Sequence, residues 1–294
     1  MGKIGIVTEE TADLPLEMTE KLKVSVVPVK LTWPELENFP GSNTFQKMRE
    51  LEAKGVESFG KTSQPSPYDF LIKFKEQLKK FHNILCINLT SKLSGSYNSA
   101  LIAKSMLTSE EQKKVFLFDS LNGSGGQALF ILKAINLMKK GKGIHDILEE
   151  LKQSVSKVHF YIMVKDSRWM AASGRIPPIL TKVIQGMAKI GIRPVLTIKN
   201  GEFVMSGLRT RARDLSTTLY QQIGKDTEKA RQLGKRIQIA ITHGDDIESA
   251  KKLRELIEKE FNNVEVVFTN IINNVVGAPA GPGTLAIAWH ALDD

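Results

Sequence analysis

The sequence predicts an α/β protein with an open, mostly parallel sheet in its first half and a mixed sheet in its second. In the first half, short apolar runs alternate with polar turns and helical stretches, as in parallel strands joined by helices. In the second half, Asn200-Gly201 separates two β-prone runs and is a strong hairpin signal. At 294 residues the chain is long enough for two such domains or for one large one.

The first half divides into four apolar runs and the helices between them. Strands are expected at residues 3–8, 24–31, 83–89 and 114–118, and an irregular loop at 33–43, where two prolines and a glycine occur. Ser66 is a candidate N-cap with Pro67 at the first helical position. Because ligands of parallel sheets bind at the carboxyl ends of the strands, the polar turns that follow these runs are candidate binding segments. Helices are expected at residues 15–22, 45–53, 97–107 and 127–140 and after Pro67.

The second half combines the hairpin with strand–helix–strand units. Hairpin strands are expected at 193–198 and 202–206, and a glycine- and proline-rich end follows the last expected strand. No repeat or low-complexity linker marks a boundary, so the domains are drawn at 1–155 and 156–294. The remaining elements expected are strands at 158–164, 236–242 and 264–268 and helices at 144–156, 166–172, 179–189, 211–233 and 247–260.

Composition narrows the class of protein. A net charge of +9 raises the question of nucleic acid, but the basic residues are mixed with acidic ones, and only 7% of residues are aromatic. The positive charge is therefore expected to form a solvated basic surface. The alternative interpretation is that it binds an acidic partner protein or an anionic lipid surface. The single cysteine, Cys86, lies in an apolar run and indicates a buried residue in a reducing cytoplasm. Neither a signal peptide nor a membrane span is expected.

Hydroxyl groups gather in two turns that each precede a predicted helix, KTSQPSP at 61–67 and LSGSY at 93–97. A helix start offers free N–H groups and a positive dipole end, so either turn suits an anion. The glycines at 123–126 lack dinucleotide and P-loop spacing, and Ser94-Gly95-Ser96 is not a nucleophile elbow. The histidines have no metal-ligand spacing. The hydroxyls therefore either cap helices or bind a carboxylate or phosphate without chemistry; no catalytic residue, metal or cofactor is predicted.

Seven segments, taken together, resemble the bacterial DegV family. In chain order they are IGIVTEETADLP, KTSQPSP, LTSKLSGSYNSA, FDSLNGSGG, ASGRI, RPVLTIKNG with the following LRTRAR, and VVGAPAGPG. The resemblance implies two α/β domains with a long-chain fatty acid in a tunnel near their junction, the second domain contributing the acyl tunnel. It also implies a non-enzymatic carrier. Some members present the fatty acid to a separate kinase, which phosphorylates the carboxylate for phospholipid synthesis.

Carried over by position, the resemblance implies that Thr62 and Ser94 bind the carboxylate. Two positions depart from the family pattern: Pro279 stands where the family has a histidine, and Glu9-Glu10 where it has aspartate-serine. The alternatives are a small-molecule transferase related to dihydroxyacetone kinases and a regulatory module that binds no lipid. The other residues that the resemblance implies are Ser63, Gly95, Ser96 and Arg175 around the ligand, and Arg209, Arg211 and Arg213 facing an acidic kinase.

Overall fold

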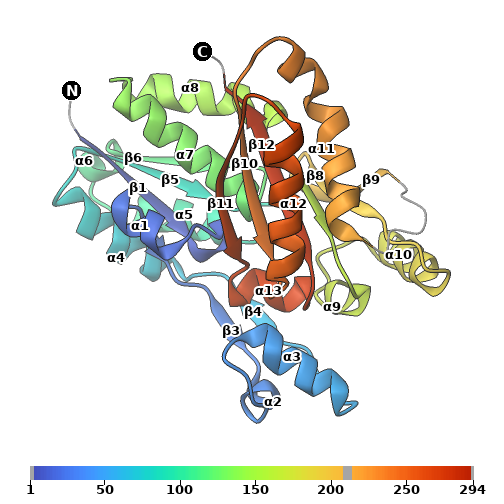
Figure 1. Cartoon of the computed structure of the whole chain (residues 1–294). Helices are drawn as coiled ribbons and strands as arrows, with labels where there is room; N and C mark the ends of the chain where they lie inside the picture. Colours follow the sequence, from blue (N-terminus) through green and yellow to red (C-terminus); the bar gives the residue numbers. More distant parts are fainter. Residues whose placement is uncertain (1–2, 208–213, 293–294) are drawn as a thin grey trace. The chain divides into compact units, whose positions relative to one another are not determined.

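The computed structural model describes residues 3–207 and 214–292 (Figure 1). These residues form two compact units. Unit 1 comprises residues 3–30, 63–158 and 200–202, and unit 2 comprises 31–62, 159–199, 203–207 and 214–292. The structure thus groups residues 31–62 with the second half of the chain. No helix within the described residues combines the length and the apolarity that crossing a membrane requires.

Unit 1 is built on a four-stranded sheet in the order β2-β1-β5-β6, and every pair in it is parallel. This confirms the predicted open parallel sheet. The strands end at one edge, where Glu9 closes β1, Asn88 closes β5 and Asp119 closes β6. The polar turns that follow the strands therefore share that edge. The strands are β1 (Ile4–Glu9), β2 (Ser25–Val27), β5 (Asn83–Asn88) and β6 (Val115–Asp119).

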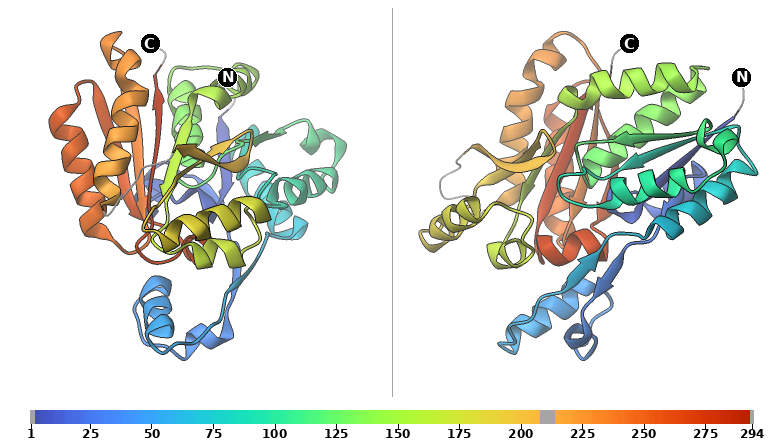
Figure 2. Two further views of the ribbon diagram at one scale, coloured as in Figure 1. Left: turned by 90° about the vertical axis from the view of Figure 1, so that its right-hand side faces the viewer. Right: turned by 180° about the vertical axis from the view of Figure 1, so that it is seen from behind.

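Helices cover both faces of this sheet. Figure 2 shows α4 and α5 on one side of the strands and α7 on the other. Phe70 and Phe74 of α4 and Ala100 of α5 are fully buried against the apolar strand residues. The predicted start of α4 is confirmed: Ser66 and Asp69 form a capping box, and Pro67 occupies the first turn. The helices are η1 (Glu10–Ala12), α1 (Leu16–Lys21), α4 (Pro67–Leu78), α5 (Ser96–Ser105), α6 (Ser109–Gln112), α7 (Gly125–Lys139), α8 (Ile144–Ser154) and η2 (Val155–Lys157).

Unit 2 is built on a six-stranded mixed sheet in the order β11-β10-β12-β7-β8-β9. β10 and β11 are parallel, whereas β12 runs antiparallel to both β10 and β7. Asn200 and Gly201 both have positive φ, as a two-residue hairpin turn requires, so the predicted hairpin is confirmed. The strands are β7 (His159–Met163), β8 (Val195–Lys199), β9 (Glu202–Gly207), β10 (Ile237–His243), β11 (Val264–Ile271) and β12 (Leu285–Ala291).

Two long helices, α11 and α12, pack on the six-stranded sheet through Leu219, Ile223, Leu253 and Ile257 (Figure 1). Residues 31–62 form a lobe that is entered through β3 (Lys30–Thr32) and left through β4 (Lys61–Ser63), which pair as a two-stranded ribbon (Figure 2). The lobe's own core is aromatic and includes Trp33 and Phe45, packed with Trp169. The helices are α2 (Pro34–Glu37), α3 (Thr44–Ala53), α9 (Ser167–Ala172), α10 (Pro178–Lys189), α11 (Leu215–Gln232), α12 (Ile247–Glu260) and α13 (Asn274–Ala280).

Two local predictions in the first half are wrong. Residues 24–31 form two short strands in different sheets, β2 and β3, because Pro28 between them has no N–H to donate to a continuous ladder. Residues 33–43 contain a short helix, α2, rather than only a loop. Pro34 occupies the first position of α2, where a missing N–H costs nothing.

The largest difference concerns residues 269–294, expected as a glycine- and proline-rich end. They contain α13 and β12, and β12 is an inner strand with a neighbour on each side. Six of its seven residues are buried. The run LAIAWHA is apolar apart from His290, as expected of a strand covered on both faces, and that apolar run was the available signal.

Candidate functional site

The turn before α5 brings Ser94 and Ser96 together. Their Oγ atoms lie 2.9 Å apart and either can donate, while the Ser96 N–H donates to Ser94 Oγ at 3.2 Å. Ser96 is fully buried, whereas Ser94 is partly exposed. Ser94 is therefore the end of this hydroxyl pair that a ligand can reach.

A carboxyl group that the sequence did not assign lies behind this pair. Glu9 is fully buried; its Oε1 accepts from the Leu89 N–H and its Oε2 from Asn88 Nδ2, both at 3.0 Å. The Ser96 side chain also interacts with Glu9, in the direction that lowers its pKa. Burial raises the pKa of Glu9 from 4.5 to about 8, against the opposing effect of these hydrogen bonds. At neutral pH the group is thus mostly protonated and does not repel an anion.

Glu10, the residue after Glu9 in the chain, lies in a different environment. Glu10 is exposed on η1, and its Oε2 accepts from the Val29 N–H at 3.2 Å. The two acids of the first motif therefore differ in burial although they are adjacent in the sequence. Glu9 is the last residue of β1, all of whose residues are buried, whereas Glu10 is the first residue of η1, so the change from strand to helix separates the two side chains.

Gly95 packs against the side chain of Gln64, which belongs to the other hydroxyl-rich motif. A Cβ built on Gly95 would come within 2.0 Å of Gln64 Oε1, so only glycine fits while Gln64 holds its place. Gln64 is fixed in turn by its Nε2, which donates to Ser99 Oγ at 3.2 Å. The two motifs are thus packed together inside unit 1 through Gln64, a residue that the sequence analysis did not single out.

The second hydroxyl of the prediction, Thr62, lies in unit 2 at the end of the lobe and contacts Arg175. The Arg175 guanidinium donates to Thr62 Oγ1. Arg175 is half-buried, and burial lowers its pKa. No carboxylate among the described residues pairs with it. The side chain of Ser63, by contrast, is exposed and makes no hydrogen bond within the described residues.

The remaining candidates are structural or lie outside the described residues. Pro279 lies inside α13. His243 Nδ1 accepts from the Asp246 N–H at 3.1 Å, and burial lowers the pKa of His243, so its ring is neutral near pH 7. Asp246 caps α12, and Asp245 pairs with Arg49. The arginines of the predicted partner-binding segment, Arg209, Arg211 and Arg213, lie outside the described residues.

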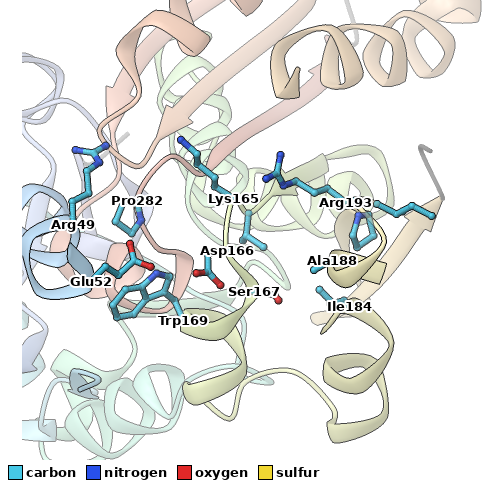
Figure 3. Close-up of a pocket in the computed structure, with 14 residues that line it drawn as sticks. Arg49, Glu52, Lys165, Asp166, Ser167, Trp169, Ile184, Ala188, Arg193 and Pro282 are labelled. Carbon is cyan, nitrogen blue, oxygen red and sulfur yellow. The ribbon is translucent and has the colours of Figure 1, made fainter. Parts of the chain in front are cut away.

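Unit 2 also contains a pocket of about 580 Å³ between α3, α9 and α10 (Figure 3). Its carboxylates, Glu52 and Asp166, both pair with Arg168. None of the predicted ligand-binding residues lines it. Among the described residues, no cluster of three His, Cys, Asp or Glu side chains could hold a metal ion. The structure therefore offers two separate hydroxyl settings, Ser94 with Ser96 and Glu9 in unit 1, and Thr62 with Arg175 in unit 2.

Comparison with known proteins identifies relatives over nearly the full length of the chain. A family model described as "Uncharacterised protein, DegV family" matches residues 3–292. Protein DegV of Bacillus subtilis is 28% identical over 97% of this chain and 98% of its own. A protein of Thermotoga maritima named "Fatty acid-binding protein" is 26% identical over 99% of both chains.

Solved structures agree with the sequence matches. A crystal structure described as that of DegV, a fatty acid binding protein from Bacillus subtilis, superimposes with a TM-score of 0.79 at 25% identity. It covers 99% of this chain and 100% of that chain. The α/β fold expected from the sequence is therefore the fold of these relatives.

Proposed function

The chain belongs to the DegV family, and on this premise we propose that it binds a long-chain fatty acid and carries it without reacting with it. In this proposal the carboxylate accepts hydrogen bonds from the hydroxyls of Thr62 and Ser94. Ser63, Gly95 and Ser96 shape the surroundings of the headgroup. Residues 1–155 supply the headgroup turns and residues 156–294 hold the acyl chain.

The observation that carries the proposal is the setting of Arg175. A half-buried guanidinium normally has a carboxylate partner, because removing a charge from water is costly. Arg175 has none among the described residues, and it donates to the Thr62 hydroxyl. With its oxygen accepting from Arg175, Thr62 keeps its own hydroxyl hydrogen for another acceptor. A fatty-acid carboxylate supplies both that acceptor and the missing negative charge.

The acyl chain supplies most of the affinity. Burial of about sixteen carbons at roughly 0.8 kcal/mol per methylene is worth on the order of 10 kcal/mol before ordering costs. The headgroup contributes orientation and selection, because a buried carboxylate must be hydrogen-bonded to be tolerated. The names of the Thermotoga and Bacillus relatives support this ligand class.

A fatty-acid carrier passes its bound ligand on to an enzyme. We propose that the bound acid is presented in the cytoplasm to a separate acidic kinase, which phosphorylates the carboxylate for phospholipid synthesis. Arg209, Arg211 and Arg213 are the proposed contact segment, since clustered arginines favour an acidic surface. Charge reversal of all three should slow association with such a kinase and leave fatty-acid affinity unchanged.

Ligand identity is the first test. Recombinant protein should carry one fatty acid per chain, detected by native mass spectrometry and by extraction. A bare chain mass with no extractable fatty acid would contradict the proposal. Turnover of ATP with short polyols by the isolated protein would instead favour the transferase alternative.

Headgroup assignment is tested by the double variant Thr62→Ala with Ser94→Ala. Each lost hydrogen bond to a charged group is worth about 1.5–3 kcal/mol, so fatty-acid affinity should fall at least a hundredfold. The matched control is Thr181→Ala with Ser105→Ala, which removes the same hydroxyl types from helices of the two units. Equal affinity of the two double variants would show that the headgroup is held elsewhere.

A further inference from the structure

The hydroxyl that would meet the ligand in unit 1 belongs to a chain of groups rather than standing alone. Glu9, Ser96 and Ser94 follow one another from a fully buried carboxyl to a partly exposed hydroxyl. A serine hydroxyl has a single hydrogen. Each serine in the chain can therefore donate in only one direction at a time.

Counting hydrogens gives two states of this chain. When Glu9 is protonated, it can donate its hydrogen to Ser96 Oγ, which leaves Ser96 to donate to Ser94 and Ser94 to donate outward. When Glu9 is ionised, Ser96 must donate to the carboxylate and Ser94 to Ser96, so Ser94 presents only lone pairs. The first state suits a carboxylate ligand and the second repels it.

We propose that the proton on Glu9 sets the direction of the Glu9–Ser96–Ser94 chain, so that an ionised fatty-acid headgroup is accepted only while Glu9 holds its proton. Glu9 is then a positioning residue that acts on the ligand through two serines. This inference rests on the proposed fatty-acid function and adds a determinant of headgroup selection and of pH dependence.

The surroundings of Glu9 are suited to this role. Both carboxyl oxygens accept hydrogen bonds, from Leu89 N–H and Asn88 Nδ2, so the group is held in place in either state. Within the described residues, no lysine or arginine pairs with it, so no positive charge holds it as an anion. Burial raises the pKa of Glu9 to about 8, which puts the change of state within an accessible pH range.

The titratable neighbours do not interfere with that change. Of the groups around Glu9, β5 contributes the Cys86 thiol, whose pKa burial and the Glu9 charge raise well above its usual value, so it stays neutral. β2 places Val27 beside Glu9, and α4 packs on β1 through phenylalanine and leucine side chains. The other acids of the segment are Glu10, which is exposed, and Asp13, which accepts from Ser124 Oγ at 2.6 Å.

The test follows the affinity for cis-parinaric acid, a fluorescent fatty acid, between pH 6 and 10. Because binding requires the Glu9 proton, the dissociation constant should rise above pH 8 by up to about tenfold per pH unit. At pH 9, in weak buffer with an indicator dye, binding should take up nearly one proton per chain. Competition by hexadecanol, which can donate to Ser94, should not weaken in the same way.

Three variants separate the possible causes. Glu9→Gln should bind with pH-independent affinity and no proton uptake, because the amide donates to Ser96 at every pH. Ser96→Ala should also flatten the profile; if it keeps the wild-type slope, the carboxylate acts by direct repulsion and the proposed relay is wrong. Glu10→Gln, the matched change of charge on the adjacent exposed residue, should keep the wild-type slope and proton uptake.

The outcomes also distinguish this inference from the function beneath it. Binding with the same affinity from pH 6 to 10 and without proton uptake would overturn the role of Glu9 and leave the carrier function standing. No binding of the probe at any pH would overturn the carrier function, and the inference with it.

Discussion

Each of the two units contains one hydroxyl of the proposed headgroup site, and the electrostatic settings of these two hydroxyls are opposite. In unit 1, Ser94 is backed by Ser96 and a buried acid that can be neutral. In unit 2, Thr62 is backed by Arg175, a guanidinium that stays charged at any physiological pH. The neighbour of one hydroxyl therefore changes charge with pH while that of the other does not, although the two hydroxyls look alike in the sequence.

The largest expected effect tests the neutral acid of unit 1 through stability. The folded-state pKa of Glu9, about 8, lies above the unfolded value of 4.5, so the folded state binds the extra proton between these values. Its contribution is therefore fully present below pH 4.5 and is lost as pH rises towards 8. The free energy of unfolding should fall by on the order of a few kcal/mol over this window in wild type and not in Glu9→Gln.

Urea unfolding at several pH values, followed by far-UV circular dichroism, measures this difference. Tryptophan fluorescence reports on unit 2, because Trp33, Trp169 and Trp289 all belong to it. It is therefore an internal control for the unit that does not contain Glu9. Glu10→Gln should behave as wild type. Parallel pH curves for wild type and Glu9→Gln would mean that the buried acid does not titrate as described.

The next effect concerns the charged setting of unit 2. Arg175→Met should weaken fatty-acid binding by about 10- to 100-fold, the cost of one or more charge-assisted hydrogen bonds, and weaken binding of a fatty alcohol much less. Arg254→Met removes the same charge from α12, where Arg254 pairs with Glu258, and should leave both affinities unchanged. Equal losses for the acid and the alcohol would contradict a role for the Arg175 charge.

The smallest effect concerns charges at the surface of unit 2. Arg49 and Asp245 form an ion pair with side chains 42% and 24% exposed, which lets water and salt screen it. A double-mutant cycle with alanine at both positions should give a coupling energy of about 0.5–1 kcal/mol that fades in 1 M salt. If the coupling energy were as large as the change in unfolding free energy expected for Glu9, buried and exposed charges would not differ in their contribution to stability.

The sequence predicted the features that short-range rules determine. Ser66 and Pro67 mark a helix start by their own chemistry, and Asn200-Gly201 marks a hairpin because few other pairs tolerate two positive φ angles. The parallel sheet of unit 1 follows from apolar runs separated by helices. These elements needed no knowledge of distant residues.

The features that were missed depend on distant partners. Glu9 becomes a neutral buried acid because the fold removes it from water, while its oxygens accept hydrogen bonds from Asn88 on β5 and from Leu89, the residue after β5. The contact between Thr62 and Arg175 joins residues 113 positions apart. The apolar run of residues 285–291 indicates a covered strand, but the neighbours of β12, β10 and β7, follow only from pairing with distant residues.

The place of β12 has a consequence for how the protein is made. The four strands of the unit 1 sheet are all synthesised by residue 119, so that sheet can assemble while the ribosome is still at work. The sheet of unit 2 is completed later, because β10 and β7 meet only through β12, which is translated after every other described strand. Until residues 285–291 emerge, the nascent chain leaves two apolar strand edges open, and these are the natural targets of chaperones.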